Sequence, residues 1–117
     1  MAIRLKRVYE KPEPGDGCRV LVDRVWPRGI KKEDLRLDAW LKELAPSTTL
    51  LQWFGHDPSK WDEFRQRYFR ELEGLREPVE SLRNRARQGP LTLVYGASDP
   101  KHNNAVALKA FLEKENL

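Results

Sequence analysis

The sequence predicts an α/β domain: a small, Rossmann-like layered fold in which a short, mostly parallel sheet of about three strands packs with about four to five helices. Two strand-like segments, residues 19–26 and 91–95, are separated by helical segments. Strands separated in this way are usually parallel neighbours joined by a crossover. A chain of 117 residues is long enough for one hydrophobic core and short for two ordinary domains. We therefore expect one α/β domain over residues 1–117.

The first part of the chain contains two of the expected strands. Apolar and basic residues alternate over residues 3–8, which predicts a half-buried strand. A loop rich in Pro, Gly and Asp follows at residues 11–17. Residues 19–26 predict the second strand, whose Val-Leu-Val run is typical of burial on both faces. The Pro-Arg-Gly sequence after it predicts the turn that ends this strand.

The middle of the chain carries apolar residues at helical spacing. Leu37, Trp40, Leu41 and Leu44 recur at i, i+3, i+4 and i+7. This spacing predicts an amphipathic helix that stops before Pro46.

Capping residues mark the helices that follow. Ser47 predicts the start of a short helix that Gly55 closes. Asp57 followed by Pro58 predicts a longer helix that ends at Gly74. The apolar stripe of this longer helix is expected to face the core; it consists of Trp61, Phe64, Tyr68 and Leu72.

The last part of the chain predicts a helix, a strand and a final helix. Residues 78–87 place apolar side chains against a charged face, on which arginines alternate with Glu77 and Glu80, and this pattern favours a solvated surface. Residues 91–95 predict the third strand. The final helix is expected to bury Ala105, Leu108, Phe111 and Leu112.

Charge and composition exclude several classes of protein. The net charge is +4, with basic residues concentrated near the two ends and acidic residues in the middle, whereas a nucleic-acid-binding arm has a denser basic run. No apolar run approaches the roughly 18 residues of a membrane span, and the first residues do not resemble a secretory signal. We expect a cytoplasmic protein that has no membrane partner.

The sequence predicts neither a metal site nor a cofactor. The single cysteine, Cys18, excludes an internal disulfide and is expected to be a buried, inert thiol. Neither His56 nor His102 has a second His or Cys at metal-ligand spacing. The glycine-rich patterns of phosphate-binding and dinucleotide-binding loops are also missing from the sequence.

Polar and small residues follow two strands that are expected to be parallel. One loop spans residues 23–29, and the other spans residues 95–99 and leads into residues 102–104. Because ligands of open parallel sheets bind beyond the carboxyl ends of the strands, these loops predict one binding edge. The candidate ligand-binding residues are Arg24, Trp26, Arg28, Tyr95, Ser98 and Asn103.

The first loop predicts a site for a planar anion. Arg24 and Trp26 are expected on one face of the second strand, and a guanidinium beside an indole suits a molecule such as a nucleotide. The alternative is structural: a salt bridge joins Arg24 to Asp23 or Asp99, and Trp26 covers the core. Arg28, beside the glycine of the turn, fits both interpretations.

The second loop leads to the N-terminus of a helix, where small residues let backbone amides approach an anion. Asp99 followed by Pro100 resembles a helix start, which favours capping as the role of Asp99. His102 is the better of the two histidines for proton transfer, although a solvated histidine at a helix entry is the favoured interpretation. If the protein is an enzyme, its acid–base candidates are Asp23, Asp99 and His102.

Several segments run in a recognisable order through nearly the full chain: residues 19–29, Trp40, 45–47, 53–58, 61–64, 91–97, Asp99 and 103–105. Together they resemble the YeaO-like branch of the domain-of-unknown-function family 488 of bacteria and archaea. The resemblance implies a small cytoplasmic α/β domain and supplies no agreed reaction, cofactor or catalytic residue. The family pattern often has Ala where this chain has Gly96.

Three hypotheses of function follow from the sequence. The first is a domain that binds a small anion, a nucleotide or a phosphorylated metabolite, with catalysis left open. The second is a non-catalytic module that interacts with nucleic acid or protein, because both ends of the chain are basic. The third is a homodimer in which the aromatic helices pair.

Overall fold

The computed structural model describes residues 1–114. Four parallel strands form its sheet: β1 (Ile3–Arg7), β2 (Cys18–Leu21), β3 (Ala39–Trp40) and β4 (Leu91–Tyr95). Their order is β1-β4-β2-β3, so the strand that comes last in sequence lies inside the sheet. The predicted α/β class is confirmed, and the second and third predicted strands are parallel neighbours.

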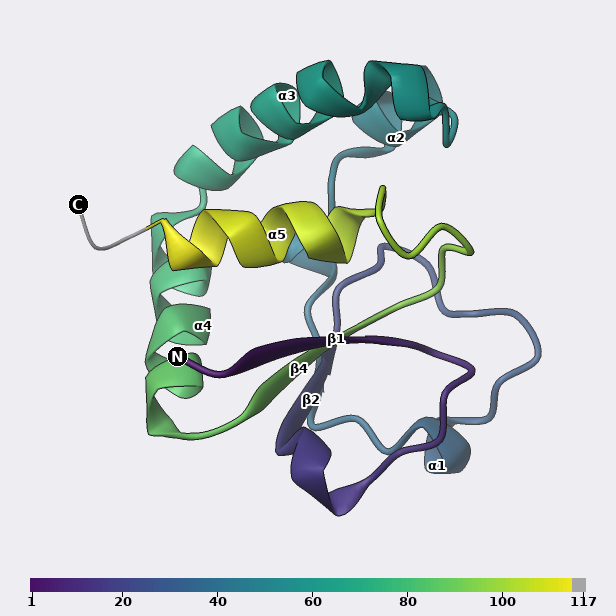
Figure 1. Ribbon diagram of the computed structural model, residues 1–117, viewed down its shortest axis with the longest axis vertical. Helices are drawn as coiled ribbons and strands as arrows, with labels where there is room; N and C mark the ends of the chain where they lie inside the picture. The colour runs from purple at the N-terminus through teal and green to yellow at the C-terminus, as the bar shows by residue number, and fades with distance from the viewer. Residues whose placement is uncertain (115–117) are drawn as a thin grey trace.

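Five α-helices surround the sheet: α1 (Lys32–Leu35), α2 (Thr48–Phe54), α3 (Trp61–Glu73), α4 (Arg76–Gln88) and α5 (Asn104–Glu113). Figure 1 shows α3, α4 and α5 on one side of the sheet and α1 on the other. Helix α5 packs on β4 and β1, and α3 packs on α5. No helix over residues 1–114 is long and apolar enough to cross a membrane.

The sheet has an apolar core on each face, because successive side chains of a strand point to opposite faces. Leu91, Leu93 and Val20 belong to the larger core, which they form with the apolar faces of α2, α3, α4 and α5. Leu21 and Val94 belong to a smaller core with Val8 and Leu35, covered in part by Trp26 and Trp40.

The predicted caps Ser47, Gly55 and Asp57 and the aromatic stripe of the long helix are confirmed. The Ser47 hydroxyl accepts the backbone N–H of Leu50 at the start of α2, and Gly55 ends that helix in the left-handed region at φ 55°. Asp57 caps a short 3-10 helix, Pro58–Lys60, that runs directly into α3. The side chains of Phe64, Tyr68 and Leu72 are fully buried.

The prediction of an amphipathic helix from Leu37 to Leu44 is wrong. The segment forms β3 and then a 3-10 helix, Lys42–Leu44. The backbone N–H groups of Asp38 and Leu41 donate to the carbonyls of Arg19 and Leu21 at 2.8 and 2.9 Å. Pairing with the edge of β2 therefore outweighs the local helical spacing, and the sheet gains a fourth strand.

The second strand is shorter than predicted. It ends at Leu21 rather than at residue 26, although the Val22 N–H still donates to the Val94 carbonyl at 3.1 Å. Arg24 and Trp26 consequently do not share a strand face, and the prediction that they do is wrong. Beyond Val22 the backbone leaves the sheet, and the Asp23 side chain continues the contact with the segment that follows β4.

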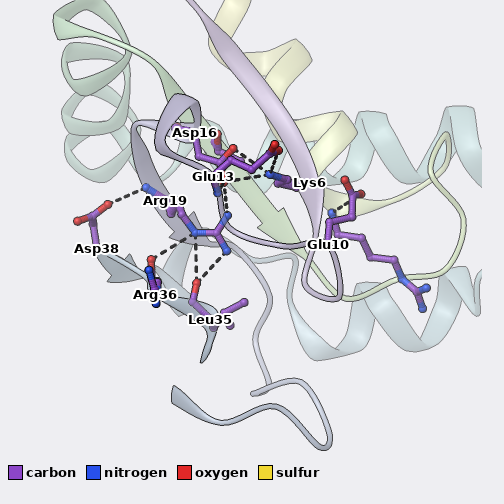
Figure 2. A network of polar contacts seen from close by, with 10 residues as sticks. Lys6, Glu10, Glu13, Asp16, Arg19, Leu35, Arg36 and Asp38 are labelled. Carbon is purple, nitrogen blue, oxygen red and sulfur yellow. Dashed lines mark hydrogen bonds and ion pairs between the residues drawn. The ribbon is translucent and has the colours of Figure 1, made fainter. Parts of the chain in front are cut away.

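A buried ionic cluster fastens a loop to the smaller-core face of the sheet (Figure 2). The Asp16 carboxylate accepts hydrogen bonds from the Lys6 ammonium at 3.0 Å and from the Arg19 guanidinium at 2.6 Å. Lys6 also pairs with Glu13 at 2.7 Å, and Arg19 donates to the carbonyl of Leu35 at 2.8 Å. The cluster holds the loop between β1 and β2 and the end of α1 against the sheet.

Candidate functional site

Asp23 joins the two loops that leave the carboxyl edge of the sheet. Its Oδ2 accepts the backbone N–H of Gly96 at 2.8 Å, and its Oδ1 accepts the side-chain amide of Asn104 at 3.0 Å. The same amide donates to the carbonyl of Val22 at 2.9 Å. The loop after β2, the loop after β4 and the start of α5 therefore meet at one carboxylate.

Partial burial of Asp23 changes the pKa of its carboxyl group. Desolvation raises the pKa of the carboxyl above its ordinary value, and the hydrogen bonds from Asn104 and Gly96 oppose this rise without cancelling it. The close approach also explains the glycine: a Cβ at position 96 would lie 2.9 Å from Asp23 Oδ2. An alanine at this position, which the family pattern often has, would require the carboxylate to shift.

Arg24 is held by backbone carbonyls. Its Nε donates to the carbonyl of Pro46 at 3.0 Å, and its Nη2 donates to the carbonyl of Ala45 at 3.1 Å. The structural alternative for Arg24, a salt bridge with Asp23 or Asp99, is replaced by these two contacts. They fix the guanidinium between the loop after β2 and the segment before α2.

Trp26 and Arg28 make contacts other than those of the Asp23 carboxylate. The Trp26 indole N–H donates to the carbonyl of Ile30 at 2.8 Å, and its ring packs edge-on to Trp40 at a centroid distance of 5.3 Å. Trp26 thus covers the smaller core, as the structural alternative predicts. Arg28 is exposed in the turn before Gly29, and its carbonyl accepts the hydroxyl of Tyr9 at 3.3 Å.

The Asp99 carboxylate makes its hydrogen bonds within the loop after β4. Its Oδ1 accepts the backbone N–H groups of Lys101 and His102 at 2.9 and 3.1 Å, and its Oδ2 pairs with His102 Nδ1 at 2.9 Å. The hydrogen bond from the Lys101 backbone, followed by the one from His102, lowers the pKa of this carboxyl. The imidazole of His102 also packs edge-on to Trp61, with ring centroids 5.4 Å apart.

The cap of α5 is Asn103, whereas the capping pattern favoured Asp99. Asn103 Oδ1 accepts the backbone N–H of Val106 at 3.0 Å, and its Nδ2 donates to the carbonyl of Asp99 at 2.9 Å. Burial mainly raises the pKa of the Tyr95 hydroxyl, and the neighbouring Asn103 side chain opposes this rise. Ser98, at the outside of the loop, is exposed.

A cleft of about 350 Å³ opens beside Asp23. Asp23, Arg24, His56 and Asn104 supply its polar groups, and the remaining lining residues are Val25, Leu51, Phe54, Gly96 and Ala97. Two of the predicted site residues, Asp23 and Arg24, therefore line one cleft. The other seven do not line it: Trp26, Arg28, Tyr95, Ser98, Asp99, His102 and Asn103.

The sequence does not single out His56 or Asn104 as a ligand-binding residue, although Asn104 lies in the second predicted loop. His56 follows Gly55, and both have left-handed backbone conformations, at φ 56° and 55°. These two residues turn the chain after α2 and bring the imidazole to the cleft. The Gly-His-Asp-Pro sequence signals a turn but not its direction, and Asn104 is the polar neighbour of the residue that was selected.

The fold and the cleft define a small α/β domain with a polar pocket at the carboxyl edge of a parallel sheet. The chain belongs to the DUF488 family: residues 2–117 match the model of its DUF488-N3i branch, described as an inactive DUF488-N3 subclade.

Two relatives illustrate the family. The chain is 45% identical over 112 residues to the uncharacterized protein YeaO of Escherichia coli K12, which covers 96% of this chain and 97% of that protein. It is 53% identical over 70 residues to the uncharacterized protein Rv3073c of Mycobacterium tuberculosis H37Rv, a match that covers 60% of this chain and 59% of that protein. No solved structure matches the chain.

Proposed function

We propose that the chain binds a small anionic ligand, of the size of a nucleotide or a phosphorylated metabolite, in the cleft beside Asp23 and that it does so without catalysis. The observation that carries this proposal is the convergence of Arg24, His56 and Asn104 on one cleft at the carboxyl edge of the sheet. This edge is where open parallel sheets bind their ligands. The cleft volume of about 350 Å³ lies within the roughly 300–1,000 Å³ of small-molecule pockets.

The groups that line the cleft suit a ligand with a charged end and an apolar or planar part. A guanidinium has more N–H donors than the two carbonyls of Ala45 and Pro46 accept from Arg24, so Arg24 can also bind an anionic group. Leu51 and Phe54 supply an apolar wall. Asp23 is an acidic lining group whose raised pKa lowers the cost of neutralising it beside a bound anion.

Binding without catalysis is supported by the state of the acid–base candidates. Both oxygens of Asp23 and both oxygens of Asp99 accept hydrogen bonds from the chain itself. His102 pairs with Asp99 and packs on Trp61 rather than lining the cleft. The description of the matching family branch as inactive agrees with a domain that recognises a ligand and does not transform it.

Thermal melts against a panel of nucleotides and phosphorylated metabolites test this proposal. A ligand at about a hundred times its Kd stabilises the folded state by roughly 2.7 kcal/mol, which raises the melting temperature of a domain of this size by about 10 °C. We expect at least one anion of the panel to produce such a shift. If no anion raises the melting temperature, the proposal is wrong.

Three variants locate the site. His56→Ala and Arg24→Lys change the cleft, and Arg28→Ala removes an exposed arginine that does not line it. The ligand-induced shift should shrink in the first two and stay in the third. The opposite pattern, with the shift lost only in Arg28→Ala, would place the ligand at the turn rather than in the cleft. Each shift is measured against the melt of the same variant without ligand.

A further inference from the structure

A second concave surface, which shares no lining residue with the carboxyl-edge cleft, lies between α4 and the β2–β3 end of the sheet. This groove, which we call the α4 groove, has a volume of about 680 Å³. Its floor is apolar and consists of Cys18, Val20, Ala39, Leu41 and Leu44. Three of these floor residues, Cys18, Ala39 and Leu41, are only half-buried, so the groove exposes apolar surface that the chain does not cover.

The layout of the helices leaves this part of the sheet open. Helix α5 packs on β4 and β1, whereas β3 is a two-residue strand at the opposite edge of the sheet. The open edge of a short strand and an apolar floor beside it are features of an interaction surface.

One wall of the α4 groove is a row of exposed side chains on α4. Glu77, Ser81 and Arg85 follow one another at one-turn spacing, and all three line the groove and are exposed. An acidic group therefore stands one turn before the serine, and a basic group stands one turn after it. Arg85 is held at the groove by a hydrogen bond from its Nε to Cys18 Sγ at 3.2 Å.

This order of charges is complementary to itself. If two α4 helices cross antiparallel on a twofold axis at Ser81, Glu77 of each copy faces Arg85 of the other. A twofold interface requires this self-complementarity, because the same patch contributes from both sides. Residues one turn apart form the ridges that most often interdigitate in helix packing, and serine at the crossing keeps the two backbones close.

We propose that the α4 groove is the interface of a homodimer in which the α4 helices of two copies pair antiparallel about Ser81. A second copy fits this surface better than another partner helix of uniform charge. A uniformly acidic helix would meet the three carboxylates of the groove, Glu43, Glu77 and Glu80. A uniformly basic helix would meet Arg85 at the position where α4 of a second copy places Glu77. The pairing also covers the half-buried floor beside β3. It does not depend on ligand binding at the carboxyl edge.

Light scattering coupled to size exclusion tests the proposal with four proteins at micromolar concentration. The unaltered chain should have twice the monomer mass of 13.7 kDa. Glu77→Arg and Arg85→Glu each turn two symmetry-related attractive pairs into repulsive ones, and each should raise the dimer dissociation constant at least about tenfold. The double variant Glu77→Arg, Arg85→Glu restores opposite charges and should dimerise again.

Arg70→Glu is the matched control, because Arg70 is exposed on α3 and its reversal changes the net charge by the same amount as Arg85→Glu. It should remain dimeric, and circular dichroism should show every variant folded. A monomeric unaltered chain, or single reversals that leave the dimer intact, would overturn the proposal. A folded double variant that stays monomeric would overturn it as well, because the Glu77–Arg85 pairing would then not hold the copies together.

Discussion

Gly96 donates its backbone N–H to Asp23 Oδ2 across 2.8 Å, although the two residues are 73 positions apart in sequence. The contact exists because β2 and β4 are parallel neighbours, so the residues that follow them leave the sheet at the same edge. The side-chain amide of Asn104, the first residue of α5, donates to the same carboxylate. One short side chain thereby fixes the relative position of three segments that surround the cleft.

Asp23→Ala should lower the free energy of unfolding by about 2 kcal/mol. The substitution leaves the Gly96 N–H and the Asn104 amide without their acceptor, at roughly 1–3 kcal/mol for each buried donor, and the removal of a desolvated carboxylate offsets part of this loss. Urea unfolding measures the difference. Asp62→Ala, on the exposed face of α3, is the control and should cost less than about 1 kcal/mol. Equal effects of the two variants would contradict the role of Asp23.

Asp16→Asn should destabilise the protein at neutral pH by about 3 kcal/mol, because it leaves the buried Arg19 guanidinium without its charged partner. Lys6→Met, which removes a different member of the cluster, should also destabilise. Both variants are compared with the unaltered chain by urea unfolding. An Asp16→Asn variant as stable as the unaltered chain would show that the cluster does not hold the loop.

The same carboxyl predicts a dependence of stability on pH. Burial alone would raise the pKa of Asp16, but the hydrogen bonds from Glu13, Lys6 and Arg19 lower it below the ordinary value of 3.8. The stabilisation from Asp16 is therefore present above that ordinary value and is lost as the pH falls through the lower pKa of the folded state. The stability difference between the unaltered chain and Asp16→Asn should shrink in this acidic range. A difference that stays constant with pH would contradict the assignment.

Gly17→Ala should cost about 3 kcal/mol or more, whereas Gly29→Ala should cost about 1 kcal/mol. Both glycines have left-handed backbones, at φ 64° and 78°. A Cβ at Gly17 would lie 2.3 Å from the Pro90 carbonyl oxygen, and a Cβ at Gly29 would meet nothing within 4 Å. At Gly29 an added Cβ is opposed only by backbone strain, whereas at Gly17 it also meets a steric clash, so the difference between the two variants measures the clash. Thermal melts measure both variants, and equal losses would show that the clash is relieved by movement.

Tyr68→Phe should cost about 1–2 kcal/mol, because the buried hydroxyl of Tyr68 donates to the carbonyl of Leu44 and its loss leaves that carbonyl unsatisfied. Tyr9→Phe removes a hydroxyl that donates to the Arg28 carbonyl at the surface and should cost less than about 0.5 kcal/mol. Denaturant unfolding of the two variants provides the comparison. A larger loss in Tyr9→Phe would contradict it.

The parts of the fold that local pattern determines could be predicted. The aromatic stripe of α3 follows from helical spacing, and the parallel pairing of β2 with β4 follows from the helices between them. The segment at residues 37–44 shows where this approach fails. Its spacing fits a helix, but the hydrogen bonds offered by β2 lie elsewhere in the sequence and draw it into the sheet.

The sequence predicts a binding edge beyond β2 and β4, and a cleft lies there, but only two of the residues named in that prediction line it. Ligand binding at this edge stays a prediction. Asp23 and Arg24 line the cleft, whereas Trp26 belongs to the smaller core because the chain turns after Val22. After the turn, Arg24 donates to the carbonyls of Ala45 and Pro46, which no local pattern places beside it. The Lys6–Asp16–Arg19 cluster was not predicted for a similar reason: Asp16 and Arg19 are neighbours in sequence, but Lys6 reaches them only once β1 lies in the sheet.

The inner position of β4 has a consequence for how the protein is made. Both β1 and β2 hydrogen-bond to β4, yet β4 begins only at Leu91. During synthesis on the ribosome, β1 therefore has no partner strand, and β2 can pair only with the two-residue β3, until β4 has been translated. A nascent fragment that ends before Leu91 cannot assemble the four-stranded sheet. Because such non-local pairing is slow to form, the growing chain exposes its strand-forming segments to self-association and chaperones until β4 emerges.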